Sequence, residues 1–176
     1  DIGITAIMGS REVSILSLVE LFNSKAQYPG KDLASGGAAD INQFCSIVVD
    51  EAKAEGVRAD VVFAQAMLET GWLKFGGDVK VAQFNFAGLG ATGGGSGGAS
   101  FLNVSQGIRA QVQHLKAYAS KDPLRGDCVD PRFYLVKRGC APYVEWLGQK
   151  ENPEGLGWAT GKGYGGKILG IMNQLR

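Results

Sequence analysis

The stretch Asp60-Val-Val-Phe-Ala-Gln-Ala-Met-Leu-Glu-Thr-Gly-Trp72 decides how the rest of this chain is expected to fold. As a helix it carries apolar side chains on nearly every side, which is typical of a helix buried in a protein core. Asp60 is expected to cap the first turn, because its carboxylate can accept hydrogen bonds from the free amides there. Gly71 favours a left-handed end to the helix. The stretch therefore predicts a central helix around which the other elements pack.

Two polar residues interrupt this apolar helix and point to chemistry. Gln65 and Glu69 lie four residues apart, so they share one face, and Trp72 stands beside Glu69 if the helical turn continues that far. A carboxylate in a core helix is costly unless it is paired or used. If it is used, desolvation favours its protonated form, which suits a general acid. The alternative is a paired core carboxylate, or one that protrudes at the helix end.

Three motifs, in order along the chain, resemble bacterial glucosaminidases of glycoside hydrolase family 73. The first is Ala64-Gln-Ala-Met-Leu-Glu-Thr-Gly-Trp72, the second is Asn85-Phe-Ala-Gly-Leu89, and the third combines Trp158-Ala-Thr160, Tyr164 and Lys167-Ile168. The resemblance runs from about Asp40 to the C-terminus. It implies a peptidoglycan substrate, cleavage of the β-1,4 bond that follows N-acetylglucosamine, and Glu69 as the catalytic acid.

Polar and aromatic residues of these motifs are the candidates for substrate binding: Gln65, Trp72, Asn85, Phe86, Trp158 and Tyr164. Aromatic faces pack well on the apolar faces of sugar rings, although each of these rings could equally belong to the core. Trp158 and Tyr164 are the stronger candidates, because they lie in a Gly-rich, polar segment. Asn85 could bond an acetamido group or position a water molecule.

The chain departs from the family where a second carboxylate is expected. Many members are proposed to carry an acid in the hairpin after the Asn-containing motif, but residues 82–116 contain no Asp or Glu, and Gln106 stands near the expected place. Our hypothesis is that the 2-acetamido group of the substrate assists the reaction, as in some glycosidases. The rival is an acid from elsewhere in the sequence: Asp78, which is the nearest after Glu69, or the more distant Asp122, Asp127 or Asp130.

Bulk composition narrows the function classes. The chain has 176 residues, which fits one globular domain, and its net charge of +1 gives no reason to expect nucleic-acid binding. No apolar run approaches the length needed to insert into a membrane. The start at Asp1 shows no signal peptide, so a mature form or an excised domain is expected. Together with the family resemblance, these features predict a secreted, cell wall-associated monomer that acts on peptidoglycan glycan strands.

Neither a metal nor another cofactor is predicted. A zinc site needs more ligands than one His and scattered Cys residues supply, and His114, which shares a helical stripe with Gln111 and Tyr118, is interpreted as structural. Cys128 and Cys140 could form a disulfide or remain free thiols, and the sequence leaves both open.

The predicted fold class is mainly α, of the α+β lysozyme-like kind: a helical lobe around the buried catalytic helix, with a small β-hairpin flanking the cleft. Residues 1–38 are expected to form an N-terminal arm and helix, and residues 39–176 the catalytic domain. Further helices are predicted after Ser10, over 40–56, from Ser105 to 120 and over 165–175, with short helices over 132–137 and 143–149 and a loop over 31–39. Residues 83–87 and 99–104 are the predicted hairpin strands, and the Gly-rich segment between them is either a flexible lip over the groove or an ordinary exposed tip.

Other functions remain alternatives to a glucosaminidase. A lysozyme-like lytic transglycosylase or muramidase would also need one Glu but would cut after muramic acid. A non-catalytic cell-wall binding module has no need of a buried acid. A purely structural helical domain accounts for the core but not for the Gly-rich segment and its neighbouring aromatic residues.

Overall fold

The computed structural model describes residues 4–91 and 97–176, and this part of the chain is mainly helical, as predicted. Its α-helices are α1 (Ile15–Lys25), α2 (Gly30–Leu33), α3 (Ile41–Glu55), α4 (Ala59–Thr70), α5 (Val104–Ala119) and α6 (Tyr164–Met172). Its 3₁₀ helices are η1 (Ala34–Gly36), η2 (Val81–Gln83), η3 (Phe133–Leu135) and η4 (Val144–Leu147). The short helices predicted near residues 132–137 and 143–149 are therefore present as single 3₁₀ turns, and the predicted loop over 31–39 is mostly helical.

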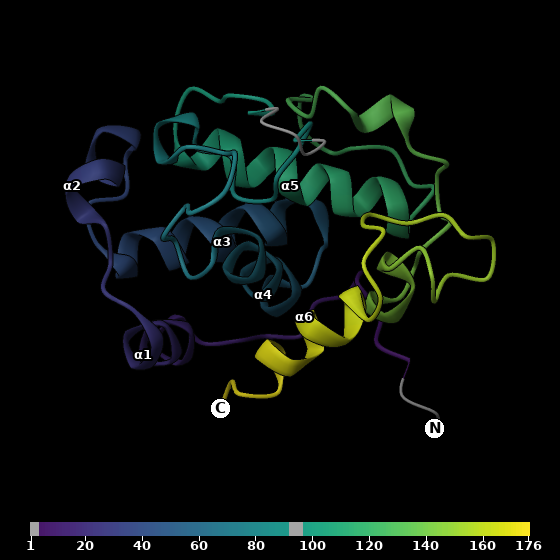
Figure 1. The fold of residues 1–176 in the computed structure, drawn as a ribbon, viewed down its shortest axis with the longest axis horizontal. Helices are drawn as coiled ribbons and strands as arrows, with labels where there is room; N and C mark the ends of the chain where they lie inside the picture. Colours follow the sequence, from purple (N-terminus) through teal and green to yellow (C-terminus); the bar gives the residue numbers. More distant parts are fainter. Residues whose placement is uncertain (1–3, 92–96) are drawn as a thin grey trace.

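Helix α4 is the central element, and it packs against α3 and α6 (Figure 1). Nearly all of its side chains are buried, in agreement with the apolar sequence. Its start differs from the prediction: Arg58, not Asp60, is the N-terminal cap residue, and it makes no side-chain capping bond. The Asp60 carboxylate accepts from the first-turn amide of Val61 at 3.0 Å, and it also binds the Arg58 guanidinium at 2.7 Å. Gly71 ends the helix in the left-handed conformation, as predicted, with a φ of 59°.

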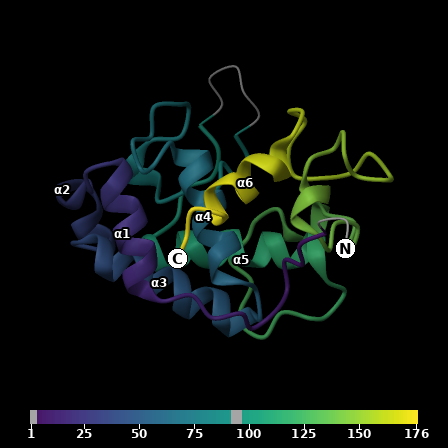
Figure 2. The ribbon, with the colours of Figure 1, turned by 90° about the horizontal axis from the view of Figure 1, so that it is seen from below.

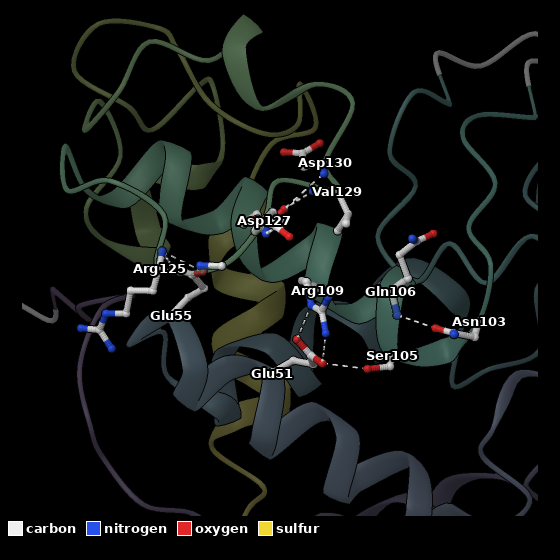
Figure 3. A network of polar contacts seen from close by, with 12 residues as sticks. Glu51, Glu55, Asn103, Ser105, Gln106, Arg109, Arg125, Asp127, Val129 and Asp130 are labelled. Carbon is white, nitrogen blue, oxygen red and sulfur yellow. Dashed lines mark hydrogen bonds and ion pairs between the residues drawn. The ribbon is translucent and has the colours of Figure 1, made fainter.

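Helices α3 and α5 lie side by side, and α3 also packs against α4 (Figure 1). Asp40 caps α3 by accepting a hydrogen bond from the Gln43 amide at 2.8 Å, and Gly56 ends it with a φ of 73°, both as predicted. The cap of α5 lies two residues before the predicted one: Asn103 caps the helix by accepting from the amide of Gln106 (Figure 3). The predicted cap, Ser105, donates its hydroxyl to Glu51 on α3.

A buried carboxylate fastens the segment after α5 to α3. Glu55 accepts a hydrogen bond from the Lys116 ammonium at 2.9 Å and from the backbone amides of Arg125 and Gly126 (Figure 3 draws the bond from Arg125). Desolvation raises the pKa of Glu55, but these donors outweigh it and the pKa is lowered. The ion pair is thus fully supplied with partners, which a buried pair requires.

The N-terminal segment belongs to the same hydrophobic core as the rest of the chain. Leu18, Phe22 and Leu33 are fully buried within it. The helix expected after Ser10 begins later, at Ile15, because Ser14 caps it by accepting from the Ser17 amide. The Ser17 hydroxyl in turn donates to the carbonyl of the last residue, so α1 and the C-terminal end lie together (Figure 2).

The predicted β-hairpin is wrong for the residues that the structure describes. The two segments do meet, through hydrogen bonds from Ala99 N to Leu89 O and from Phe101 N to Gln83 O, both of 2.8 Å, but neither forms a strand. Left-handed residues interrupt the extended backbone that a strand needs, with φ values of 51° at Phe84 and 64° at Gly88. The tip of the predicted flexible lip, residues 92–96, lies outside the described residues.

Three further features bear on the sequence predictions. Cys128 and Cys140 are free thiols, so the disulfide alternative is not realised. Within residues 4–91 and 97–176, no helix is long and apolar enough to cross a membrane. The same residues hold no group of three His, Cys, Asp or Glu side chains suited to a metal ion.

Candidate active site

Glu69 lies in the last turn of α4, at the wall of a pocket of about 270 Å³. The loops that follow α4 and η2 supply the other walls, and the lining residues are Glu69, Thr70, Phe75, Gly77, Asp78, Val79, Asn85, Gly88 and Ala91. A larger hollow of about 710 Å³ between α1 and the C-terminal residues contains no residue of the three motifs among its described lining. The Glu69 pocket is therefore the candidate active site.

The surroundings of Glu69 favour its protonated form. The side chain is exposed to solvent at the pocket, and its carboxyl group contacts the buried hydroxyl of Tyr164. Desolvation raises the pKa of Glu69, and a hydrogen bond from Tyr164 opposes the rise without cancelling it. A glutamic acid that keeps its proton closer to neutral pH is suited to general acid catalysis.

Tyr164, the first residue of α6, is the direct partner of Glu69. Its hydroxyl donates to Glu69 Oε2 at 2.5 Å, and burial together with the neighbouring carboxylate raises the pKa of Tyr164 well above the ordinary value of a phenol. Its side chain is buried, so the structure does not present its ring as the predicted sugar-stacking platform. The sequence motif identified a residue of the site, but its contact is with the acid.

Gln65 also lies behind the acid and not in the substrate pocket. It is fully buried, its Nε2 donates to Tyr164 Oη at 3.0 Å, and its Oε1 accepts from Gln111 Nε2 at 3.0 Å. The structure thus places Gln65 behind Glu69, outside the described lining of the pocket. Gln111 was not among the predicted site residues, although the helical stripe that it shares with His114 and Tyr118 was the available signal.

Asn85 organises the loop over the acid, and all of its side-chain hydrogen-bonding capacity is used in doing so. Its Nδ2 donates to the carbonyls of Leu89 and Ala99, and its Oδ1 accepts from the amides of Ala87 and Leu89. With two donors and two lone pairs engaged, it has no group left for an acetamido group or a water molecule. The predicted direct contact with substrate is thus replaced by a positioning role.

Gly88 stands directly over the acid because of this loop. A Cβ atom at this position would lie 3.2 Å from Glu69 Oε1, and its φ of 64° suits glycine. Glycine therefore leaves open the space in front of Oε1, while Oε2 is covered by Tyr164.

Phe86 and Trp72, two predicted sugar platforms, pack into the core. Phe86 is fully buried between Phe44 and Phe75, so it cannot touch a substrate. Trp72 follows the end of α4, where a left-handed φ of 60° turns it away from the helix, and its ring packs against Phe22 and Phe63. The helical turn that would have placed it beside Glu69 does not continue past Thr70.

Trp158 is the predicted platform that lines a hollow. It is partly exposed in a second pocket of about 280 Å³, where His114 and Tyr118 of α5 are its aromatic neighbours. His114 is held by Asp130, with 2.7 Å between Nδ1 and the carboxylate, in line with its structural interpretation. Gly88 and Ala91 line both pockets, so the hollow at Trp158 adjoins the one at Glu69.

The structure also ranks the rivals for a second acid. Asp78 shares the pocket with Glu69, and no other acid occurs among the described lining residues. Asp130 is occupied by His114 and by the Arg132 amide. Gln106, which stands near the expected place of an acid, closes the first turn of α5 by accepting from the Leu102 amide.

Comparison with known proteins gives a family match over most of the chain. A family model described as "Glucosaminidase: Mannosyl-glycoprotein endo-beta-N-acetylglucosaminidase" matches residues 45–176. A protein of Borreliella burgdorferi named "Uncharacterized protein" is 46% identical over 135 residues, which cover 77% of this chain and 63% of that protein. This chain therefore spans less than two thirds of the length of that relative. No solved structure gives a significant match.

Proposed function

This chain belongs to the glucosaminidase family, and from that premise we propose that it hydrolyses peptidoglycan at the β-1,4 bond between N-acetylglucosamine and N-acetylmuramic acid, with Glu69 as general acid. The family membership confirms the resemblance found in the sequence and makes the chain a glycosidase of the endo-β-N-acetylglucosaminidase kind that acts on a glycan. The mainly helical structure agrees with the lysozyme-like fold class. Because peptidoglycan lies outside the cytoplasmic membrane, the proposal includes secretion to the cell wall.

One observation supports this role above the others: the carboxyl of Glu69 opens onto a pocket and is backed by the buried hydroxyl of Tyr164. Cleavage requires a proton for the leaving oxygen and support for the positive charge that develops on the sugar. Glu69 supplies the proton, and the Tyr164 hydroxyl stabilises the carboxylate that this transfer leaves behind. The adjoining hollow at Trp158 provides an aromatic face for a neighbouring sugar of the strand.

The proposal is tested by digesting purified peptidoglycan with the wild-type protein and the Glu69→Gln variant, followed by mass spectrometry of the released ends. Reducing N-acetylglucosamine ends are expected from wild type, and the variant should be about 100- to 10,000-fold slower, which is the usual contribution of a general acid. Anhydromuramic or reducing muramic ends would place the protein with the transglycosylases or muramidases. Binding to the wall without any cleavage would indicate a binding module.

The second catalytic group is either Asp78 or the 2-acetamido group of the substrate. We retain substrate assistance as the proposal, because Asp78 is exposed and lies in the loop after α4, with no hydrogen bond to Glu69 or to its neighbours given by the structure. The Asp78→Asn variant should then keep turnover within about tenfold of wild type, whereas loss of a nucleophile or base costs about 100-fold or more.

A thioacetamido or deacetylated glycan gives the complementary measurement. Substrate assistance predicts that removing the acetyl group abolishes cleavage by wild-type protein. If the deacetylated glycan is still cleaved and Asp78→Asn is inactive, Asp78 is the second acid and the proposed assistance is wrong.

A further inference from the structure

A chain of hydrogen bonds runs from the backbone of α4 through α5 and α6 to the acid. Gln111 Nε2 donates to Val62 O and to Gln65 Oε1, both at 3.0 Å. Gln65 Nε2 donates to Tyr164 Oη at 3.0 Å, and the Tyr164 hydroxyl donates to Glu69 Oε2. Gln65 and Gln111 are fully buried and Tyr164 is buried. No water is therefore needed to complete the chain.

The donor and acceptor of every bond in this series follow from its first acceptor, the carbonyl of Val62. Val62 O is a backbone carbonyl, which can only accept, so the Gln111 group that faces it must be the amide nitrogen. The same nitrogen then offers its second proton to Gln65, which fixes Gln65 with its oxygen toward Gln111 and its nitrogen toward Tyr164. Because Tyr164 Oη accepts from Gln65, its single proton is directed to Glu69.

The cost of this arrangement is visible on Gln111. Its Oε1 is the buried side-chain oxygen without a hydrogen-bond partner among the described residues. Rotating the amide would give the oxygen no better place, since it would then face the Val62 carbonyl. A buried acceptor without a partner is unfavourable, so its retention at this position calls for an explanation.

We propose that Gln111 and Gln65 are positioning residues that fix the acidic proton of Glu69 on Oε1, the oxygen that faces the substrate. Oε2 always receives the Tyr164 proton, so a protonated Glu69 must carry its own proton on the other oxygen. Oε1 lies in front of Gly88, where the missing side chain leaves room for the glycosidic oxygen. The inference deepens the proposed function and rests on Glu69 as its acid.

In the reaction, the acetamido oxygen bonds to C1 as the bond between C1 and the leaving oxygen breaks, and the electron pair of that bond goes to the leaving oxygen, which takes the proton from Oε1. Glu69 becomes a carboxylate, and the Tyr164 hydroxyl stabilises the new charge at Oε2. A water molecule later bonds to C1, displaces the acetamido oxygen and returns a proton to Glu69. Gln111 and Gln65 touch neither the sugar nor the proton, because they act through Tyr164.

The Gln111→Leu variant removes the polarity of the chain while keeping most of the volume. Gln65 can then rotate and accept the Tyr164 proton, so that Tyr164 Oη accepts a proton from Glu69 Oε2. The charged form of Glu69 loses its donor, and the neutral form gains a bond with its proton on the covered oxygen. We expect kcat to fall several-fold with little change in KM. The midpoint of the basic limb of the pH–activity profile should move up by roughly half to one pH unit, which corresponds to the free energy of one hydrogen bond.

Few other titratable groups near Glu69 can shift the basic limb of the pH–activity profile. The titratable neighbours of Glu69 are Tyr164 from α6 and Asp78 from the loop after α4. Tyr118 of α5 acts on Tyr164, and His114 lines only the adjoining pocket. The remaining described residues of the Glu69 pocket carry no charge. A shift in Gln111→Leu is therefore assigned to the chain.

Gln113→Leu is the matched control. Gln113 is a fully buried glutamine on the same helix, but its amide binds Asp127 O and the amides of Val129 and Asp130, away from Glu69. Its loss should lower stability and leave the basic limb in place. If both variants move the limb equally, or if a folded Gln111→Leu protein keeps the wild-type limb, the proposal is overturned.

Neutron diffraction on crystals of the wild-type protein, held below the pKa of Glu69, tests the inference without any variant. The expected result is a deuteron on Oε1 and the Tyr164 deuteron pointing to Oε2. A deuteron on Oε2 would contradict the proposal. This measurement does not depend on hydrolysis. Activity of the Glu69→Gln variant would refute Glu69 as the general acid, whereas the neutron structure alone decides which oxygen of Glu69 carries the proton.

Discussion

Glu69 is held in a state that is useful for proton transfer and unfavourable for folding. Its pKa is raised in the folded protein by desolvation, despite the bond from Tyr164. A carboxyl whose pKa is higher when folded binds more protons in the folded than in the unfolded state between the two pKa values, so stability declines as the pH rises through that window. The loss begins near the unfolded value of about 4.3 and is complete above the folded one.

Glu69→Gln should therefore be more stable than wild type at pH 7. The amide has no charge to desolvate, and its oxygen can still accept from Tyr164. Thermal unfolding over a pH series is the measurement, and the difference between the two proteins should close as the pH falls below about 4. Tyr164→Phe is the contrasting variant: it removes the donor to the carboxylate and also the acceptor of the buried Gln65 amide, so it should be less stable than wild type at pH 7. A Glu69→Gln protein that melts below wild type at pH 7 would contradict the desolvation of Glu69.

The sequence motifs single out Glu69 and its partner Tyr164, but they do not reveal Gln111, which lies behind them. Glu69 and Tyr164 stand out because their motifs combine unusual residue types with a spacing that local helix geometry explains. Gln111 is 46 residues from Gln65, and no local pattern says which face of α5 meets α4. Phe86 was assigned to the substrate for the same reason, since an aromatic residue in a motif looks alike whether it faces a groove or the core.

At the scale of elements, α5 approaches the loop that holds Phe84 closely at Gly107. A Cβ atom on Gly107 would lie 1.7 Å from the Phe84 carbonyl oxygen, far inside contact distance. The missing side chain of Gly107 thus permits the approach that places the loop over Glu69. The contact joins helix packing directly to the shape of the pocket.

Gly107→Ala should destabilise the protein by about 1–3 kcal/mol, because the backbone of either element must shift. Helix propensity alone predicts the opposite, a gain of about 0.5–1 kcal/mol. Gly170→Ala on α6 is the matched control, since its Cβ would meet no atom within 4 Å, and it should show that gain. Urea unfolding measures both changes. Activity should fall only in Gly107→Ala, and equal stability changes in the two variants would refute the steric argument.

The mispredicted hairpin has a physical cause. Around residues 83–101, side-chain amides take the place of the backbone hydrogen bonds expected in a hairpin. Gln83 Nε2 donates to the carbonyl of Gly97, and Asn85 Nδ2 donates to the carbonyls of Leu89 and Ala99. The alternation of apolar residues there predicts a strand, but side-chain bonds to the backbone compete with a ladder. By contrast, the ends of α3 and α4 were predicted correctly where Asp40, Gly56 and Gly71 satisfy local geometry without distant partners.

At the scale of the whole molecule, the boundary predicted at residues 38 and 39 separates segments that share one core. Leu18, Phe22 and Leu33 are fully buried together with residues of α3 and α4. The ring of Trp72, just beyond the end of α4, lies 6.4 Å from that of Phe22. The segment before residue 39 is thus expected to support the position of α4, although the family match begins only at residue 45.

A chain of residues 39–176 should therefore lose its cooperative unfolding transition and its activity on peptidoglycan. Removing a single buried Phe side chain costs about 3–5 kcal/mol, and a typical domain has only about 5–15 kcal/mol of stability to lose. Deleting several such side chains exceeds that reserve.

Two point variants of the full chain locate the effect. Phe22→Ala should lower stability by about 3–5 kcal/mol. Leu16→Ala, on the exposed face of the same helix at 64% exposure, should change it by less than about 0.5 kcal/mol. Calorimetry and the cleavage assay follow both, and activity should decline in step with stability because Glu69 depends on α4 being held in place. If residues 39–176 alone unfold at the temperature of the full chain and still cleave the glycan, the N-terminal segment is the separate arm that the sequence predicted, and its burial contributes nothing to the catalytic lobe.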